Sequence, residues 1–297
     1  MRVDATSALP IDLAAAVTRA VPEAEVRTHA GLPPDLEQTD ALVCLLSDRI
    51  DAALLARAPK LRVVANCAVG VDNIELAACA RAGVIVTNTP DVLTEATAEL
   101  AFALMLAAAR RLAEGDRLVR SGGWTGWALD QLLGVELAGK TAGVVGFGRI
   151  GQAFARRAAA FDMRVIHAGR GADLDALFAA ADVVSLHCPL TPETRHLVDA
   201  RRLARMKPTA ILVNTARGGC VDSAALADAL AAGTLFAAGL DVYEGEPAID
   251  ARLLASPRAV LAPHIGSATT RTRTAMAQLC ADAVIDVLSG RVPRNRV

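Results

Sequence analysis

The stretch Gly143-Val-Val-Gly-Phe-Gly-Arg-Ile-Gly151 carries the pattern G-x-G-x-x-G at Gly146, Gly148 and Gly151. It follows an apolar run typical of a buried strand and opens a helical run, the context in which this pattern indicates dinucleotide binding. Gly146 permits a tight turn, Gly148 lets the backbone approach a pyrophosphate, and Gly151 allows close packing of helix on strand. The first amides of the helix would then face the phosphates. The alternative is an ordinary tight turn, which the flanking elements make the weaker interpretation.

Outward from this turn, short apolar runs alternate with helical stretches over nearly the whole chain. Continuous apolar runs are typical of parallel strands covered on both faces, and they lie at 41–46, 61–65, 84–86, 143–147, 164–168, 182–187, 210–214, 236–241 and 259–262. Helical patterns fill the intervals, among them 151–161, 173–181, 222–232 and 270–288, with Asp222 as an N-cap. The alternation predicts an α/β fold of doubly wound sheets.

The chain's 297 residues suit two α/β domains. The segment Asn88-Thr89-Pro90-Asp91 indicates a boundary, because a long Ala/Leu helix, 95–112, follows it. We therefore expect a first domain of residues 1–92 that the last helix rejoins, 268–297, and a dinucleotide-binding domain at 93–267.

Composition excludes several classes of function. The formal net charge is -1, and neither sign dominates, which argues against a nucleic-acid partner or an anionic membrane surface. The longest apolar run, Leu100–Ala109, is half of what a bilayer-spanning helix needs. No signal-peptide pattern opens the sequence, and the six cysteines form no C-x-x-C pair. We expect a cytoplasmic protein with no membrane contact and no metal site.

The strand at 164–168 ends in Gly169-Arg170, where an NAD-binding unit usually carries an acid for the ribose hydroxyl. Gly169 leaves room for a 2′-phosphate, and the Arg170 guanidinium can pair with it. The pair favours NADP(H), with NAD(H) as the second possibility; the alternative is that Arg170 is a solvated surface charge. Only residues 171–181 separate this strand from the next one, so an edge strand of the cofactor domain is predicted to be missing.

Three segments at strand ends carry polar side chains that suit one reaction. They are Asn214–Gly219, Leu240–Pro247 and Pro263–Thr269, and they supply Arg217, Glu246 and His264. Ligands of doubly wound sheets bind at this edge. An Arg can hold a carboxylate through two bonds, and a His oriented by an acid can protonate a carbonyl oxygen. These groups suit reduction of a 2-keto acid by a nicotinamide cofactor.

At these residues the sequence resembles the D-isomer-specific 2-hydroxyacid dehydrogenase family. The resemblance covers nearly the whole chain and rests on motifs in order along it: 66–73, 87–91, the glycine turn, 187–194 and the three strand-end segments. It implies a flavodoxin-like substrate domain and a Rossmann cofactor domain. It also implies catalysis by Arg217, Glu246 and His264, with His264 as proton donor, and substrate binding by Arg217 and the amides of Val69 and Gly70. The cofactor would contact Gly146, Gly148, Arg149, Ile150, Gly151, Gly169, Arg170, Cys188, Pro189, Thr215, Ala216, Asp241 and Gly266.

Within the family the chain looks most like glyoxylate/hydroxypyruvate reductases. The resemblance implies a homodimer in which Trp124 or Trp127 reaches the partner's site; the alternative is that both anchor their loop on their own subunit. Two other functions stay open: a D-3-phosphoglycerate-type dehydrogenase, and a nucleotide-sensing module like the corepressors of this fold.

Overall fold

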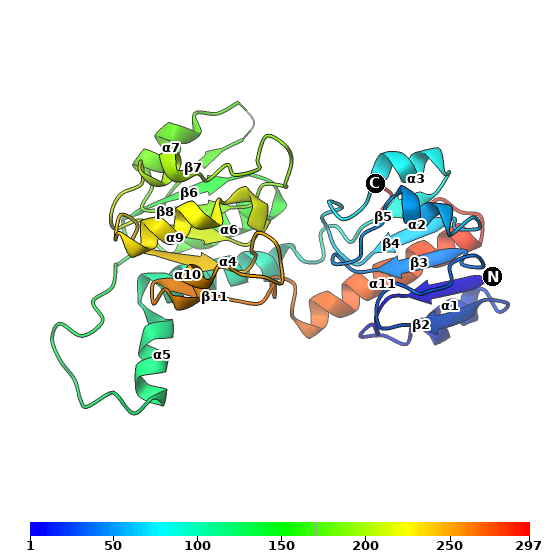
Figure 1. The fold of residues 1–297 in the computed structure, drawn as a ribbon, viewed down its shortest axis with the longest axis horizontal. Helices are drawn as coiled ribbons and strands as arrows, with labels where there is room; N and C mark the ends of the chain where they lie inside the picture. The colour runs from blue at the N-terminus through cyan, green and yellow to red at the C-terminus, as the bar shows by residue number, and fades with distance from the viewer. Residues whose placement is uncertain (170) are drawn as a thin grey trace. The chain divides into compact units, whose positions relative to one another are not determined.

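The chain forms two compact units, each built on one parallel sheet (Figure 1). The computed structural model describes residues 1–169 and 171–297. Unit 1 comprises Met1–Leu93 and Ser267–Val297, and unit 2 comprises Thr94–Gly266.

Unit 1 contains a five-stranded sheet in the order β2-β1-β3-β4-β5. This is the flavodoxin-like order, as expected for the first domain. The strands are β1 (Arg2–Ala5), β2 (Glu25–Thr28), β3 (Ala41–Cys44), β4 (Val63–Asn66) and β5 (Ile85–Thr87). The helices are α1 (Leu13–Ala20), α2 (Ala52–Ala56), α3 (Leu76–Arg81) and α11 (Thr270–Leu288).

Successive residues of the unit 1 strands face opposite sides of the sheet. Val43 and Val63 pack with α1 and α11 in one core, whereas Leu42 and Val64 pack with α2 and α3 in the other. Both faces of this sheet are therefore covered, which explains why its central strands read as unbroken apolar runs.

Unit 2 contains a six-stranded sheet in the order β11-β10-β9-β8-β6-β7. Its strands are β6 (Thr141–Val145), β7 (Arg164–Ala168), β8 (Val183–Leu186), β9 (Ile211–Asn214), β10 (Ala237–Leu240) and β11 (Ala259–Leu261). Its helices are α4 (Thr94–Ala109), α5 (Leu112–Arg120), α6 (Arg149–Ala160), α7 (Leu174–Ala180), α8 (Ala200–Leu203), α9 (Ser223–Ala231) and α10 (Ala251–Ala255), with a 3-10 turn, η1 (Gly218–Cys220). Asp222 accepts a bond from Ala225 N at 3.0 Å, which confirms the predicted N-cap.

β7 is an edge of the unit 2 sheet and pairs with β6 alone among the described residues. The chain runs from β7 through α7 directly into β8, on the other side of β6. A Rossmann sheet normally carries a third strand beyond its second one. The structure therefore agrees with the prediction that this edge strand is missing.

The predicted helix at 95–112 is confirmed over most of its length, but its last turn is wrong. α4 ends at Ala109, and Arg111 adopts a left-handed conformation (φ 53°) before α5 begins at Leu112. None of the residues of α5 is buried, and in Figure 1 α5 and the loop after it project from the body of unit 2.

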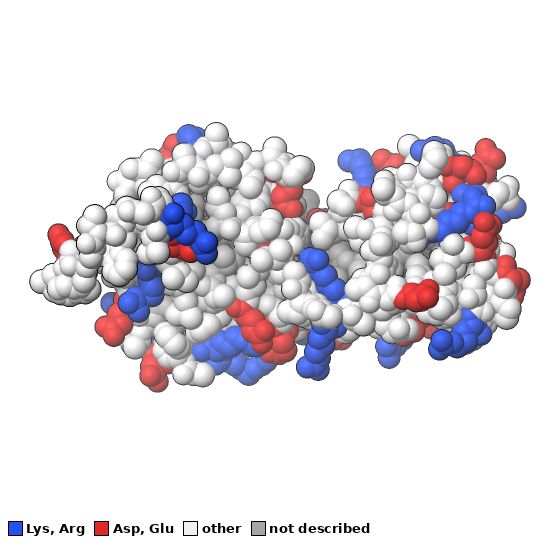
Figure 2. All heavy atoms as spheres, turned by 90° about the horizontal axis from the view of Figure 1, so that it is seen from below, with Lys and Arg blue, Asp and Glu red and all other residues white. Residues whose placement is uncertain are grey.

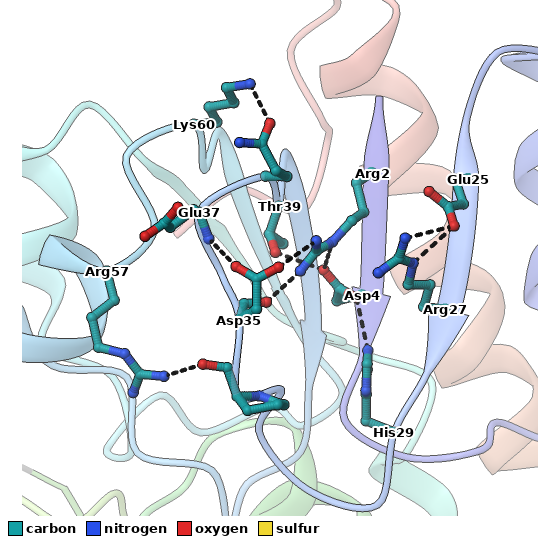
Figure 3. Close-up of polar contacts among 12 residues, drawn as sticks. Arg2, Asp4, Glu25, Arg27, His29, Asp35, Glu37, Thr39, Arg57 and Lys60 are labelled. Carbon is teal, nitrogen blue, oxygen red and sulfur yellow. Dashed lines mark hydrogen bonds and ion pairs between the residues drawn. The ribbon is translucent and has the colours of Figure 1, made fainter.

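β1 and β2 were absent from the strands that the sequence predicts. β1 is fully buried although it carries two charges, Arg2 and Asp4, that break its apolar pattern. Figure 3 shows why burial is tolerated: Arg2 Nε lies 2.8 Å from Asp4 Oδ2, and Thr39 Oγ1 donates to the same oxygen at 2.6 Å. His29 Nε2 lies 2.8 Å from Asp4 Oδ1. β2 is an exposed edge strand whose residues show little apolar signal.

Charged side chains of both signs are interspersed over the face drawn in Figure 2, in keeping with the net charge of -1. Among the described residues, no helix has the length and apolar character needed to cross a membrane.

Candidate active site

The three predicted polar segments follow β9, β10 and β11, which are neighbours in the unit 2 sheet. Because these strands are parallel, their carboxyl ends lie at one edge of the sheet. Arg217 follows β9, Glu246 follows β10, and His264 follows β11. The fold thus brings the loops of all three candidate catalytic residues to the same edge.

Glu246 and His264 form a hydrogen-bonded pair. His264 Nδ1 lies 2.8 Å from Glu246 Oε2, with side chains 26% and 30% exposed. The second carboxylate oxygen, Oε1, accepts a bond from Tyr243 N at 2.8 Å. Burial opposes the charged carboxylate, but the bonds from His264 and Tyr243 N–H, with the charges of His264 and Arg217, lower the pKa of Glu246 below its usual value. Glu246 is therefore a fixed anion beside the imidazole.

Asp241 holds the turn that carries His264. Its carboxylate accepts Ile265 N at 2.7 Å and Gly266 N at 2.8 Å, while its backbone oxygen accepts His264 N at 2.9 Å. His264 has φ 53°, a left-handed conformation that a non-glycine residue adopts only when its surroundings enforce it. Burial raises the pKa of Asp241, and the two amides partly offset that effect. The backbone of the turn, and hence the position of His264, depends on this buried carboxyl group.

The Arg217 turn packs directly on the loop after β10. A side chain at Gly218 would collide with the backbone of Tyr243 and Glu244, so only glycine permits this approach. Within the turn, Asn214 Nδ2 donates to Arg217 O at 2.9 Å. The close approach places the cation of Arg217 near enough to Glu246 to affect its pKa.

A second polar cluster, which sequence reasoning missed, joins the same loops. Glu244 Oε1 accepts Arg195 Nη2 at 2.9 Å and lies 2.8 Å from His196 Nε2. His196 N also donates to Gly219 O at 2.8 Å, beside the Arg217 turn. The segment after β8 therefore ties together the two loops that carry Arg217 and Glu246. The motif at 187–194 ends just before Arg195 and His196, so no sequence signal indicated these two residues.

The glycine turn has the geometry that each glycine predicts. Gly146 has φ 89°, and a Cβ there would lie 2.7 Å from Cys188 N. A Cβ on Gly151 would collide with Gly146 O, so α6 packs tightly on the turn. A Cβ on Gly148 would meet nothing within 4 Å, which leaves open space at the N-terminus of α6.

Those features fit a dinucleotide pyrophosphate at the start of α6. At the carboxyl end of β9, the hydroxyl oxygen Thr215 Oγ1 is buried and has no hydrogen-bond partner among the described residues. Arg149 and Ile150 form the first turn of α6, and Cys188 and Pro189 follow β8 beside Gly146. The residues around the glycine turn therefore fit a bound dinucleotide.

At Gly169, the predicted ribose end, a side chain would meet nothing within 4 Å. Arg170, the predicted partner of a 2′-phosphate, lies outside the described residues. Nearby, the Phe147 and His167 rings stack with centroids 3.9 Å apart.

The remaining predicted residues are distributed over both units. Ala216 follows Thr215 after β9, and Gly266 lies in the His264 turn with its amide on Asp241. Val69 and Gly70 belong to unit 1, in the loop after β4, and both are half-buried. His187 is partly buried beside Phe154, and desolvation lowers the pKa of His187 to about 4, so its imidazole is neutral near pH 7.

A parallel sheet with this glycine turn, and with an acid–histidine pair at its carboxyl edge, defines a dinucleotide-dependent oxidoreductase. Residues 102–266 match the family model described as "D-isomer specific 2-hydroxyacid dehydrogenase, NAD binding domain". The chain is 48% identical over 279 residues to a glyoxylate reductase of Thermococcus litoralis, covering 88% of this chain and 84% of that protein.

Solved structures agree with this assignment. A protein of Thermus thermophilus superposes with TM-score 0.93 at 46% identity, covering all of both chains. An NADPH-dependent glyoxylate/hydroxypyruvate reductase of Sinorhizobium meliloti, in complex with NADP and malonate, superposes with TM-score 0.87 at 32% identity, covering 100% of this chain and 96% of that one. The chain belongs to the D-isomer-specific 2-hydroxyacid dehydrogenase family and is an NAD-dependent oxidoreductase.

Proposed function

We propose that the protein reduces a small 2-keto acid of the glyoxylate or hydroxypyruvate type to the 2-hydroxy acid, with D configuration where the product is chiral. The observation that carries this proposal is the His264–Glu246 pair, with its 2.8 Å bond, on the loops that adjoin the Arg217 turn. The similarity to glyoxylate reductases supports the substrate class.

In this proposal, each residue of the triad has one task. Glu246 occupies His264 Nδ1, which leaves Nε2 as the ring nitrogen that donates a proton to the substrate's carbonyl oxygen. Glu246 also stabilises the protonated imidazole as a neighbouring negative charge. Arg217 holds the substrate by charge-assisted hydrogen bonds, together with the amides of Val69 and Gly70. Residues 1–92 with 268–297 are the proposed substrate domain, and 93–267 the cofactor domain.

The proposed cofactor site takes the pyrophosphate at Gly146, Gly148, Gly151 and the first turn of α6. When bound, the reduced nicotinamide supplies the hydride that the carbonyl carbon receives. Thr215, Ala216, Asp241 and Gly266 flank the nicotinamide end, and the backbone of Cys188 and Pro189 flanks the middle. We propose a preference for NADPH, supported by the open space at Gly169 and the absence of an acid there. Arg170 is the proposed partner of the 2′-phosphate.

The proposed assembly is a homodimer formed through α5 and the loop after it. This arm, residues 112–133, carries exposed apolar side chains: Leu112, Val119, Trp124, Trp127, Leu129 and Leu133. Trp127 is 81% exposed and Leu129 80%, which is costly in water unless a partner covers them. A cytoplasmic location is proposed on the six cysteines, all of which are free thiols.

The proposal is tested by a matrix of steady-state assays. Glyoxylate, hydroxypyruvate, pyruvate and a bulkier keto acid are each measured with NADH and with NADPH. We expect the highest kcat/KM for glyoxylate or hydroxypyruvate with NADPH. A clear NADH preference would refute the cofactor proposal alone, whereas tight cofactor binding without turnover of any small keto acid would refute the enzymatic function and favour a sensor.

A further inference from the structure

The loop Cys67–Gly70 after β4, here called the carboxylate loop, is held by bonds to its carbonyl oxygens. Thr89 N donates to Ala68 O at 2.9 Å, and Asn88 Nδ2 donates to Val69 O at 2.8 Å. On its other side, Asn66 Nδ2 donates to Gly70 O at 2.8 Å. Three successive carbonyl groups of the loop therefore face protein donors.

These bonds also determine where the loop's amides point. In a trans peptide the C=O and the following N–H lie in one plane and point in opposite directions. The bond to Ala68 O therefore orients the N–H of Val69, and the bond to Val69 O orients the N–H of Gly70. These two amides are the ones proposed to bind the substrate carboxylate, and each is turned away from the donor that fixes its peptide.

Asn88 is in turn held by hydrogen bonds to the C-terminal segment. Asn88 N donates to Asn295 O at 3.2 Å, and Asn295 Nδ2 donates to Asn88 O at 2.6 Å. The contact continues as an antiparallel bridge between Thr87 and Arg296. Asn295 is only 8% exposed, so its side chain is committed to this contact.

The same peptide rule extends the connection by one step. Asn88 C=O and Thr89 N–H belong to one trans peptide, so the Asn295 side chain that holds the carbonyl also aims the Thr89 N–H at Ala68 O. The chain of bonds runs from the Asn295 amide through the Asn88–Thr89 peptide to the Ala68–Val69 peptide, and it ends at Val69 N–H.

We propose that Asn295, acting through Asn88, is a positioning residue for substrate binding: it orients the carboxylate-binding amides of Val69 and Gly70. The inference rests on the proposed function, because it needs a keto-acid carboxylate at these amides. Both asparagines lie in unit 1, whereas the glycine turn belongs to unit 2. Their loss should therefore weaken binding of the keto acid and leave cofactor binding intact.

The test compares Asn295→Ala, Asn88→Ala and the double variant with wild type. We measure KM and kcat for the preferred keto acid, the Kd of oxamate on the enzyme saturated with NADPH, and the Kd of NADPH alone. Each single variant should raise KM and the oxamate Kd about fivefold to tenfold, the loss expected for one well-formed hydrogen bond. We expect kcat and the NADPH Kd within about twofold of wild type. The double variant should lose less than the product of the single effects, because both changes interrupt one chain of bonds.

Arg291→Ala is the matched control, because Arg291 is exposed, lies four positions before Asn295 and pairs with Asp286 at 2.9 Å, outside this chain of bonds. It should leave all four quantities unchanged. If Asn295→Ala unfolds, Asn295→Asp keeps the volume and removes the donor. Wild-type KM and oxamate Kd in folded Asn88 and Asn295 variants would overturn the inference. A wild-type enzyme that neither turns over keto acids nor binds oxamate would instead overturn the proposed function on which it rests.

Discussion

His264 occupies a backbone conformation that is unfavourable for a residue with a side chain, at φ 53°. Such strain costs on the order of 1–3 kcal/mol and persists only where neighbouring groups enforce it. Asp241 supplies that enforcement through three bonds to residues 264–266. At this scale, His264, the proposed proton donor, is positioned first by its backbone and second by its bond to Glu246.

The variant Glu246→Gln tests the role of the carboxylate charge. Glutamine keeps the size of the side chain but removes the anion that stabilises a protonated imidazole. We expect a loss of about tenfold to 10³-fold in kcat/KM, and an alkaline limb of the pH profile that moves to lower pH. The measurement is kcat/KM between pH 5 and 10. An unshifted profile would show that Glu246 acts only by packing.

The ionised Glu246 carboxylate makes the stability of the fold depend on pH in one direction. Its pKa lies below the usual value of 4.5, so the ionised carboxylate stabilises the folded state above that pH. This contribution is lost as pH falls through the lowered pKa. Wild type should therefore lose more stability between pH 6 and 3 than Glu246→Gln, as measured by urea unfolding. Parallel stability curves for the two proteins would contradict the assignment.

Unit 1 also contains a buried carboxylate with a lowered pKa, Asp4. Burial opposes its charge, yet bonds from Thr39, Arg2 and His29 lower its pKa. Asp4→Asn should leave the buried Arg2 without this partner and reduce the free energy of unfolding by about 3 kcal/mol. Asp116→Asn is a suitable control, because Asp116 pairs with Arg120 at an exposed site. Urea unfolding at pH 7 distinguishes the two, and equal, small losses would refute the argument.

At the scale of elements, two glycines of the turn between β6 and α6 have different roles: Gly151 allows the helix to pack on the turn, and Gly148 leaves space for a ligand. Gly151→Ala would collide with Gly146 O, so we expect lower thermal stability and weaker cofactor binding together. Gly148→Ala meets open space in the protein, so the melting temperature should stay within about 2 °C. It would meet the proposed pyrophosphate, so NADPH affinity should fall at least tenfold. Unchanged affinity in Gly148→Ala would contradict the proposed phosphate site.

Most strands that could be predicted are those whose apolar runs reflect two-sided burial, whereas β7 is a partly exposed edge strand with a shorter apolar run. The loops that carry the candidate catalytic residues could be located because parallel strands end at one edge. β1 escaped prediction because its burial depends on Asp4 and its partners from residues 29–39, a pairing that spacing does not reveal. The Glu244 cluster escaped because its members come from segments about 50 residues apart, which only the fold brings together.

The break between α4 and α5 was missed for a related reason. Arg110 and Arg111 are ordinary helix formers, and the helix ends there because Arg111 turns to φ 53° and pairs with Glu114 at 2.8 Å. Helical periodicity continues across this point in the sequence. The consequence is an arm whose apolar side chains are exposed in unit 2.

At the scale of the whole molecule, the exposed arm of residues 112–133 is the basis for the proposed homodimer. Replacing Trp127 and Leu129 by Ser should remove apolar area from the proposed interface and shift a homodimer toward monomer. Light scattering after gel filtration at several concentrations measures this shift. Val292→Ser is the matched control, because Val292 is 72% exposed in unit 1. A wild-type monomer at micromolar concentration, or a dimer that survives both substitutions, would refute the proposed interface.

The central claim is that His264 donates the proton in a keto-acid reduction. The most direct test compares kcat/KM for glyoxylate with NADPH in wild type and His264→Ala, alongside NADPH affinity by fluorescence titration. We expect a loss of about 10²–10⁴-fold in kcat/KM, with cofactor affinity within about twofold of wild type. Turnover within tenfold of wild type in His264→Ala would contradict it.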